Sequence, residues 1–395
     1  MRILIVSDCY APRLGGIETQ VRDLARNLLA IGHEPIVVTA TPDGSARGHT
    51  IEEPDGFKVH RITAPIPGEL PIHPRAGREL YQLMTELRPN AVHVHVGIIS
   101  PFAWSGLSVA TRRGLPVAAT FHCVLGPWAA AGALSGPLSP VAHWRRAGVD
   151  LTAVSTMLAQ EVSRAGGGDA VTVLPNGITI EDWRLRQTPR LVEPGQPIRV
   201  VASLRWIARK CPMEVLQAFT RAVEITGNET ATVSVYGDGP LREQMHATVA
   251  DSPLVDRINL VGRVERSRLA QDFQEADIYL QTSPADSFGI AALEGRCAGL
   301  AVVGVASSGL ADFITDGQDG YLADGVEGLA QALARLLTNL EDLNRIKAHN
   351  LAVDPLPVWS SAVQLNVQAY ERARVTARRR YEQRHAASLS GDQDL

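Results

Sequence analysis

Residues 283–303, SPADSFGIAALEGRCAGLAVV, carry two acidic residues eight positions apart, one on each side of a helix start. Asp286 lies in a Ser/Pro-rich turn after the strand-like run IYLQTS, and Glu294 lies in an apolar run of helix formers without proline. The pattern predicts strand, turn and helix. Free N–H groups and the dipole of a helix N-terminus favour a phosphate, and acids beside it can accept hydrogen bonds from sugar hydroxyls. The segment therefore indicates a nucleotide-sugar site, but it also fits an ordinary helix with Asp286 or Ser287 as N-cap and Glu294 exposed to solvent.

Size and composition limit the class of protein. The chain has 395 residues, 45% of them hydrophobic, which favours two domains over one. A net charge of -4 disfavours a nucleic-acid partner. The four cysteines are far apart and form no CxxC pair, and the first residues, MRILIVSD, lack a signal-peptide pattern. No run of 18 apolar residues is present. We therefore expect a cytoplasmic protein.

Short β-branched runs alternate with helical patterns along the chain, which predicts α/β architecture with parallel sheets. One series of strands begins at residues 2–7 and a second at 198–204. We expect a Rossmann-like acceptor-binding domain at 1–185, joined by a C-terminal helix at about 360–385, and a Rossmann-like donor-binding domain at 186–359. The last residues, 386–395, are expected to be a disordered tail.

Candidate phosphate-binding residues follow the first strand of each series. Gly15 and Gly16 precede a helix, where glycine lets the backbone approach a ligand. Arg205 and Lys210 follow the strand at 198–204, and ligands of open α/β sheets bind beyond the carboxyl ends of the strands. Two cations there suit a diphosphate. A plain Gly-Gly turn and a pair of surface cations are the alternatives.

Histidines and acids are the candidate metal ligands of this chain. VHVHV places His93 and His95 on one face of a strand, which makes them a possible metal pair. His122 ends another strand, on the rim where ligands bind. No third ligand has matching spacing, and the only D-x-D pair, Asp392 and Asp394, lies in the tail. We therefore expect no metal and no cofactor. The charge of a diphosphate leaving group would then be met by the basic residues and helix N-termini.

Eight short motifs occur in an order that resembles one enzyme family. They are GGIE (15–18), TFH (120–122), VLPNGI (173–178), RWIARK (205–210), VYGDGPL (235–241), VGRV (261–264), DSFGIAALE (286–294) and DGQDGYL (316–322). Together they resemble the retaining GT-B glycosyltransferases of family 4, over residues 1 to about 372. The resemblance implies a GT-B fold, in which two Rossmann-like domains have parallel sheets that face each other across a cleft.

The resemblance also implies roles for matching residues. The catalytic set would be His122, Arg205, Lys210 and Asp286. Further contacts with the donor would come from Gly15, Gly16, Val264, Phe288, Gly289, Ile290 and Glu294. His122 would face the anomeric centre, Asp286 would bind sugar hydroxyls and Glu294 would bind the ribose. The family usually has Glu where this chain has Asp286.

These features predict a retaining glycosyltransferase. It would move a hexose from a nucleotide-diphosphate sugar to an acceptor hydroxyl by a metal-independent front-face mechanism, and the resemblance alone implies GDP-mannose or a UDP-hexose as the donor. A nucleotide-sugar epimerase of the same fold, or a non-enzymatic nucleotide-sugar-binding protein, is the alternative. The acceptor could be a glycan, a lipid-linked compound or a small molecule. Arginines in the segment 358–384 fit either peripheral contact with the inner membrane face or a solvated helix end.

Overall fold

The computed structural model describes residues 1–13, 15–44, 47–65, 71–97, 99–126, 131 and 134–391. The chain divides into two compact units. Unit 1 comprises Met1–Gly177 and Trp359–Leu395, and unit 2 comprises Ile178–Val358. Residues 178–185, which we had expected in the first domain, therefore belong to unit 2.

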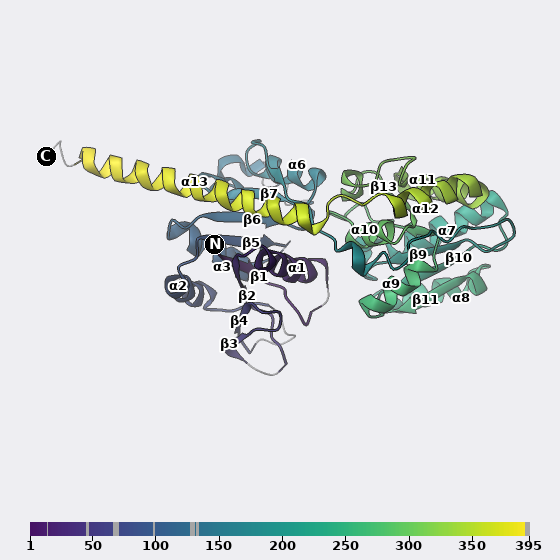
Figure 1. Ribbon diagram of the computed structural model, residues 1–395, viewed down its shortest axis with the longest axis horizontal. Coiled ribbons are helices and arrows are strands. Elements are labelled where there is room, and N and C mark those ends of the chain that lie inside the picture. Colours follow the sequence, from purple (N-terminus) through teal and green to yellow (C-terminus); the bar gives the residue numbers. More distant parts are fainter. Residues whose placement is uncertain are drawn as a thin grey trace. The chain divides into compact units, whose positions relative to one another are not determined.

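Unit 1 is built on a sheet with the strand order β3-β4-β2-β1-β5-β6-β7-β8 (Figure 1). All neighbouring strands are parallel except β3 and β4. The strands are β1 (Arg2–Ser7), β2 (Glu34–Thr39), β3 (Gly48–Glu52), β4 (Lys58–Thr63), β5 (Ala91–Val96), β6 (Val117–Phe121), β7 (Asp150–Ala153) and β8 (Thr172–Val173). The α-helices are α1 (Gly16–Ala30), α2 (Ala76–Leu87), α3 (Pro101–Arg112), α5 (Pro140–Arg146), α6 (Thr156–Ala165) and α13 (Trp359–Gly391).

The last helix, α13, completes the core of unit 1. It runs along the sheet over β5, β6 and β7 and beside α1 (Figure 1). Trp359 and Tyr370 of α13 join the apolar cluster that contains Leu24 and Leu28 of α1. These two leucines are four positions apart and therefore share one face of their helix. The sheet of unit 1 is thus covered by helices from both ends of the chain.

Unit 2 contains a six-stranded parallel sheet with the order β11-β10-β9-β12-β13-β14. Its strands are β9 (Arg199–Ser203), β10 (Thr232–Tyr236), β11 (Ile258–Gly262), β12 (Ile278–Leu280), β13 (Ala301–Val305) and β14 (Gly320–Ala323). Its α-helices are α7 (Pro212–Thr226), α8 (Arg242–Ala250), α9 (Arg266–Gln274), α10 (Ile290–Cys297), α11 (Gly325–Thr338) and α12 (Leu340–Ala352). Numbered within the unit, this is the Rossmann order 3-2-1-4-5-6, which reverses direction between β9 and β12.

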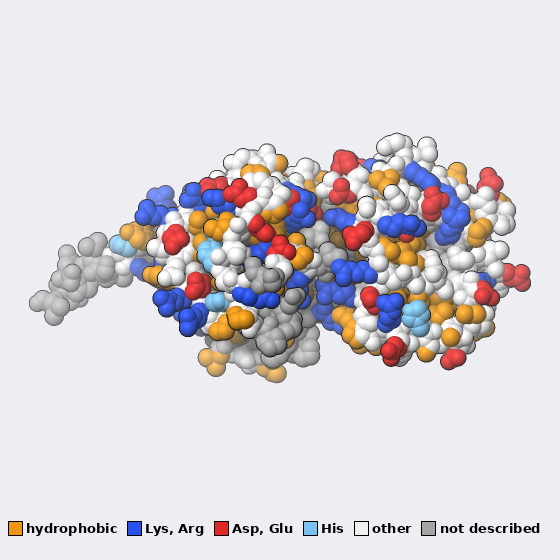
Figure 2. Space-filling model, turned by 90° about the horizontal axis from the view of Figure 1, so that it is seen from below, with side chains coloured by type: hydrophobic (Ala, Val, Ile, Leu, Met, Phe, Trp, Pro, Cys, Tyr) orange, Lys and Arg blue, Asp and Glu red, His pale blue; other side chains and the backbone are white. Residues whose placement is uncertain are grey.

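The observed elements confirm the predicted α/β architecture with two parallel sheets. The predicted strands did not include β3 and β14, and the predicted tail began too early. Strand β3 was missed because its side chains are mostly exposed and give no apolar pattern. Residues 386–391, expected in a disordered tail, continue helix α13, while residues 392–395 lie outside the described part of the chain. Figure 2 shows basic and acidic side chains intermixed on the visible surface of each unit.

Candidate active site

The strand order in the sheet of unit 2 reverses direction between β9 and β12. The loops that follow these two strands meet at this point. Thr282, just after β12, donates a hydrogen bond to the carbonyl oxygen of Cys211 at 2.8 Å. Ser283 donates to the carbonyl oxygen of Arg209 at 2.9 Å. The loop after β9 is thereby fixed against the loop after β12, at the edge where Rossmann-type sheets bind ligands.

Lys210 and Asp286 form an ion pair at this edge, with 3.1 Å between Nζ and Oδ2. Oδ1 of Asp286 accepts a hydrogen bond from the backbone N–H of Gly289 at 3.1 Å. The alternative in which Asp286 or Ser287 is the N-cap of α10 is wrong, because the N-cap residue is Gly289; Asp286 instead bonds to the backbone of that residue. A carboxylate has about four acceptor sites, so Asp286 can hold this turn and still accept hydrogen bonds from a ligand.

Gly289 is required by the packing around the start of α10. Its φ is +90°, and a Cβ atom there would lie 2.3 Å from Cδ1 of Leu310. Gly309 is equally restricted, because its Cβ atom would lie 2.3 Å from the carbonyl oxygen of Ser287. The buried Phe288 packs on Phe313 with 5.3 Å between ring centroids. The turn before Ile290, the first residue of α10, is thus rigidly held by the loop after β13.

Glu294 lies in the second turn of α10, as predicted, but it is not a solvated surface residue. It is 8% exposed, and its Oε1 lies 3.5 Å from Nη2 of Arg266. Burial raises the pKa of the neighbouring Tyr279 hydroxyl, and the charges of Asp286 and Glu294 raise it further. Tyr279 therefore stays neutral and donates a hydrogen bond to the carbonyl oxygen of Ser203 at 3.0 Å.

The remaining donor-site candidates of unit 2 lie on neighbouring loops. Arg205 follows β9, is exposed, and forms no ion pair with any residue in the described ranges. Its loop touches the loop after β10, where a Cβ atom on Gly237 would lie 1.8 Å from the carbonyl oxygen of Leu204. Val264 is half-buried just beyond β11. The Arg205 side chain is therefore available to an anion, whereas Lys210 is paired with Asp286.

In unit 1, the Gly-Gly pair starts α1 as expected. Gly15 is the N-cap in an extended conformation, no side chain caps the helix, and Gly16 is its first residue. Gln20 exchanges two hydrogen bonds with the backbone of Gly177, at 3.0 and 3.1 Å. A Cβ atom on Gly177 would lie 2.4 Å from the indole ring of Trp359. The absence of a side chain at Gly177 therefore allows the loop at residues 175–177 (the PNG loop) to meet α1 and α13.

His122 lies beside a cavity that the sequence did not reveal. Its Nε2 is 2.7 Å from Nδ1 of His95, and its backbone N–H donates to Val96 at 2.9 Å. The cavity is lined by residues of β5, β6, α1, α13 and the PNG loop, namely Gln20, Leu24, His93, His95, Thr120, His122, Leu174, Pro175, Asn176, Trp359 and Asn366. Burial lowers the pKa of His122 to about 4 and that of His93 to about 3, and places that of His95 well below its ordinary value. All three rings are therefore neutral at neutral pH.

His93 and His95 lie on one face of β5, as predicted, but they bond to other side chains of unit 1. His93 contacts Tyr370 and Thr120, while His95 contacts His122. Within the described ranges, no group of three or more His, Cys, Asp or Glu residues is arranged to hold a metal. Metal independence itself stays a prediction.

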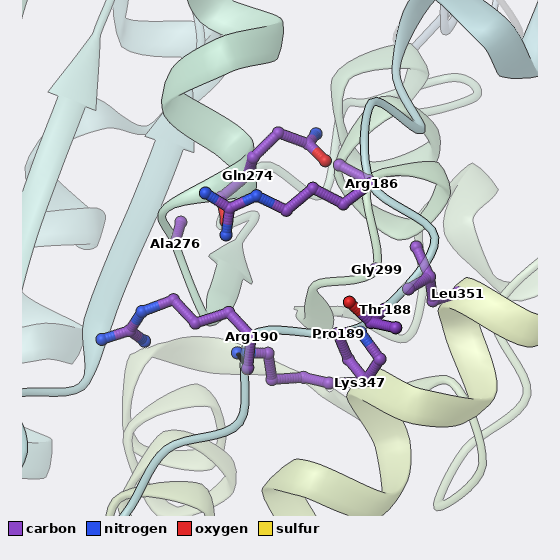
Figure 3. A pocket seen from close by; sticks show the side chains of 10 residues that line it. Arg186, Thr188, Pro189, Arg190, Gln274, Ala276, Gly299, Lys347 and Leu351 are labelled. Carbon is purple, nitrogen blue, oxygen red and sulfur yellow. Dashed lines mark hydrogen bonds between the residues drawn. The ribbon is translucent and has the colours of Figure 1, made fainter.

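A cavity of unit 2 lies at the opposite edge of its sheet from Asp286, near the start of β12 (Figure 3). Arg190 and Lys347 lie on one side of it and Arg186 and Gln274 on the other (Figure 3). Both Arg190 and Lys347 bond to the fully buried carboxylate of Asp277. Each of these basic residues has an acidic partner, Asp277 for Arg190 and Lys347 and Glu275 for Arg186, so we assign this cluster no ligand.

The arginines of α13 are largely engaged in ion pairs or hydrogen bonds. Arg372 pairs with Asp150, and Arg378 pairs with Glu382. Arg380 donates to the carbonyl oxygen of Arg146. These contacts favour the solvated helix end over the membrane interpretation. In the described part of the chain, no helix combines the length and the apolar character that a membrane span requires.

The chain has two Rossmann-type units, and unit 2 carries a cation, a carboxylate and a helix start at its switch point. These features are those of the GT-B class of glycosyltransferase folds. Residues 14–182 match the family model described as Glycosyltransferase Family 4, and residues 185–351 match Glycosyl transferases group 1. The chain belongs to this glycosyltransferase family and is an enzyme that acts on nucleotide sugars.

Individual relatives agree with this assignment. The chain is 24% identical to a phosphatidylinositol N-acetylglucosaminyltransferase subunit of Arabidopsis thaliana, over 94% of this chain and 82% of that protein. It is 27% identical to a glycogen synthase of Mycobacterium tuberculosis, over 85% and 86% of the two chains. The solved structure of Anabaena Alr3699/HepE in complex with UDP and glucose superposes with a TM-score of 0.70, at 17% identity over 94% of this chain and 99% of that one.

Proposed function

We propose that this protein is a retaining hexosyltransferase, with GDP-mannose or a UDP-hexose as donor. The observation that carries the proposal is the cluster of Lys210, Asp286 and the α10 start at the switch point of unit 2. A lysine and free helix N–H groups suit a diphosphate, and the carboxylate beside them suits sugar hydroxyls. Glu294, eight residues further, would accept hydrogen bonds from the ribose, and Val264 would lie near the base.

The reaction creates an oxocarbenium-like centre and a nucleoside diphosphate that departs with its negative charge. Lys210 and the exposed Arg205 would stabilise this charge without a metal ion. Asp286 is committed to the turn and to Lys210, so it is poorly placed to act as a nucleophile. We therefore favour a front-face substitution, in which the departing phosphate takes the proton of the acceptor hydroxyl. His122 would contact the donor sugar.

The acceptor is proposed only as a hydroxyl compound. The relatives are named for a phosphatidylinositol substrate in one case and for glycogen in the other, so they support both lipid-linked and glycan acceptors. Peripheral contact with a membrane would accompany a lipid-linked acceptor.

The test is to incubate the full chain with UDP-glucose, UDP-N-acetylglucosamine or GDP-mannose. Each donor is offered alone, with a glucan, or with vesicles that contain phosphatidylinositol or diacylglycerol, and free nucleoside diphosphate is measured. We expect release that depends on an acceptor. Conversion of a donor into an epimeric sugar without any acceptor would instead identify an epimerase, and binding without turnover would identify a non-enzymatic binder.

Lys210→Ala tests the phosphate-binding role within the same assay. We expect it to lose about 100-fold or more in kcat, because one preorganised group on the developing charge is removed. Lys58→Ala is the matched control, since Lys58 is an exposed lysine on β4 of unit 1. Near-normal turnover by Lys210→Ala would show that the lysine serves only to hold Asp286.

A further inference from the structure

The histidines of β5 belong to a buried chain of hydrogen bonds whose direction can be deduced. Nδ1 of His93 is 2.9 Å from the hydroxyl of Tyr370, and its Nε2 is 2.7 Å from Oγ1 of Thr120. Oγ1 of Thr120 is 2.7 Å from Oγ1 of Thr152, which donates to the carbonyl oxygen of Ala119 at 3.1 Å. The chain thus joins α13 to three adjacent strands.

A carbonyl oxygen can only accept, so the single hydroxyl proton of Thr152 is used on Ala119. Thr120 must then donate its own proton to Thr152 and accept from Nε2–H of His93. Nδ1 of His93 consequently accepts from the Tyr370 hydroxyl. Only one protonation pattern satisfies every contact, so His93 is a fixed, oriented ring.

His95 packs on this fixed ring, with 4.1 Å between the ring centroids of His93 and His95. His95 also stacks on His122, with 4.9 Å between the ring centroids, and its Nδ1 lies 2.7 Å from Nε2 of His122. Among the side chains that line the cavity, two fully buried polar atoms, Nε2 of His95 and Nε1 of Trp359, have no hydrogen-bond partner among the described residues. Trp359 can only donate.

Between two neutral imidazoles, one nitrogen donates and the other accepts. If His122 donated, Nε2 of His95 would carry a buried N–H without a partner, a situation that folded proteins rarely tolerate. If His95 donates, its Nε2 is a bare acceptor. The other fully buried atom without a partner among the described cavity residues, Nε1 of Trp359, is a donor. The second arrangement is the favourable one.

We propose that His95 is a positioning residue that fixes the ring orientation and tautomer of His122, through donation from its Nδ1–H to Nε2 of His122. His122 is then the Nδ1–H tautomer, because the hydrogen bond at one imidazole nitrogen decides which nitrogen carries the proton. The inference rests on the proposed function for its effect on catalysis, since there His122 contacts the donor sugar. The tautomer itself is a property of unit 1 alone.

The first measurement is the ¹⁵N spectrum of the histidine rings in the ligand-free protein at neutral pH, with His122 assigned by substitution. We expect Nδ1 of His122 to be protonated and Nε2 to be unprotonated. In His95→Phe, which keeps the ring stack but removes the donor, we expect a mixture of tautomers. An Nε2–H or mixed form in the unsubstituted protein would overturn the proposal, and this readout requires no substrate.

The second measurement is turnover. We expect His95→Phe to lower kcat about 100-fold with little change in KM for the donor, as a misoriented catalytic group does. His95→Asn should restore much of kcat, because its amide can donate near the position of Nδ1. His60→Phe is the matched control, since His60 is also buried, also paired with a histidine (His49, 2.9 Å) and also has an unpaired Nε2.

The outcomes separate the two proposals. If the unsubstituted protein transfers no sugar, the proposed function fails while the tautomer result still stands. If it is active and His95→Phe keeps kcat within about twofold, the positioning role fails. Should His95→Phe not fold, the spectrum of the unsubstituted protein and the kcat of His95→Asn, expected to stay within about 10-fold, decide the question.

Discussion

Acidification should destabilise unit 1 through its buried histidines. Burial lowers the pKa values of His93, His95 and His122 far below 6.5, their value in an unfolded chain. A group with a lowered native pKa contributes stability that is fully present above 6.5 and is lost as the pH falls toward the native pKa. At pH 5.5 the unfolded chain binds about one proton on each of these residues and the native state almost none, which costs between about 1 and 2 kcal/mol per histidine.

The three losses sum to about 4 kcal/mol between pH 8 and pH 5.5. Two other groups nearly cancel in this range. Burial lowers the pKa of His60 to about 4, which adds to the loss, while burial raises the pKa of Asp8 to about 6, so protonation of Asp8 relieves a cost as the pH falls. Each of these effects is worth about 1 kcal/mol.

Urea unfolding at a series of pH values measures this dependence. The transition of unit 1 is identified as the one that Tyr370→Phe shifts, because Tyr370 lies in the core of that unit. We expect the free energy of unfolding to fall by about 4 kcal/mol, and His122→Asn to remove about a third of the fall. A constant or rising stability between pH 8 and pH 5.5 would refute the reasoning, as would an unchanged fall in His122→Asn.

Two further substitutions test the packing of each unit. Gly289→Ala should destabilise unit 2 by at least about 2 kcal/mol and weaken donor binding, because Gly289 has a positive φ and a Cβ atom there would clash with Leu310. Gly317 also has a positive φ but lies in open space. Gly317→Ala should therefore cost only about 1 kcal/mol in the same urea titration. Tyr370→Phe should destabilise unit 1 by about 1 to 3 kcal/mol, because Nδ1 of His93 loses its hydrogen-bond donor. An unchanged urea midpoint for Tyr370→Phe would contradict this expectation. Equal effects of the two alanine substitutions would contradict the first one.

The sequence was sufficient for the two sheets because buried parallel strands have continuous apolar runs. It also located Asp286 and Glu294 on either side of a helix start, since turn and helix are local patterns. It could not show that Asp286 pairs with Lys210, because that contact depends on β9 and β12 being neighbours in space.

The histidine cluster was beyond sequence reasoning for the same reason. The period of two placed His93 and His95 on one face of a strand. Their partners come from β6 and from α13, and Tyr370 lies 277 residues away from His93 in the chain. Register between β5 and β6, with His95 opposite Thr120, brings His122 within reach of His95. Only the assembled sheet shows that the two histidines of the apparent metal pair have different hydrogen-bond partners, Tyr370 and Thr120 for His93 and His122 for His95.

The division of the chain has a consequence for its synthesis on the ribosome. Unit 2 is one continuous segment, Ile178–Val358, and it contains its own core, so it can fold as soon as that segment has emerged. Unit 1 begins 177 residues earlier, yet its core contains Trp359, Val363 and Tyr370. The half of the protein that is translated first is therefore the half that is completed last, and its apolar strands must wait for α13 to cover them.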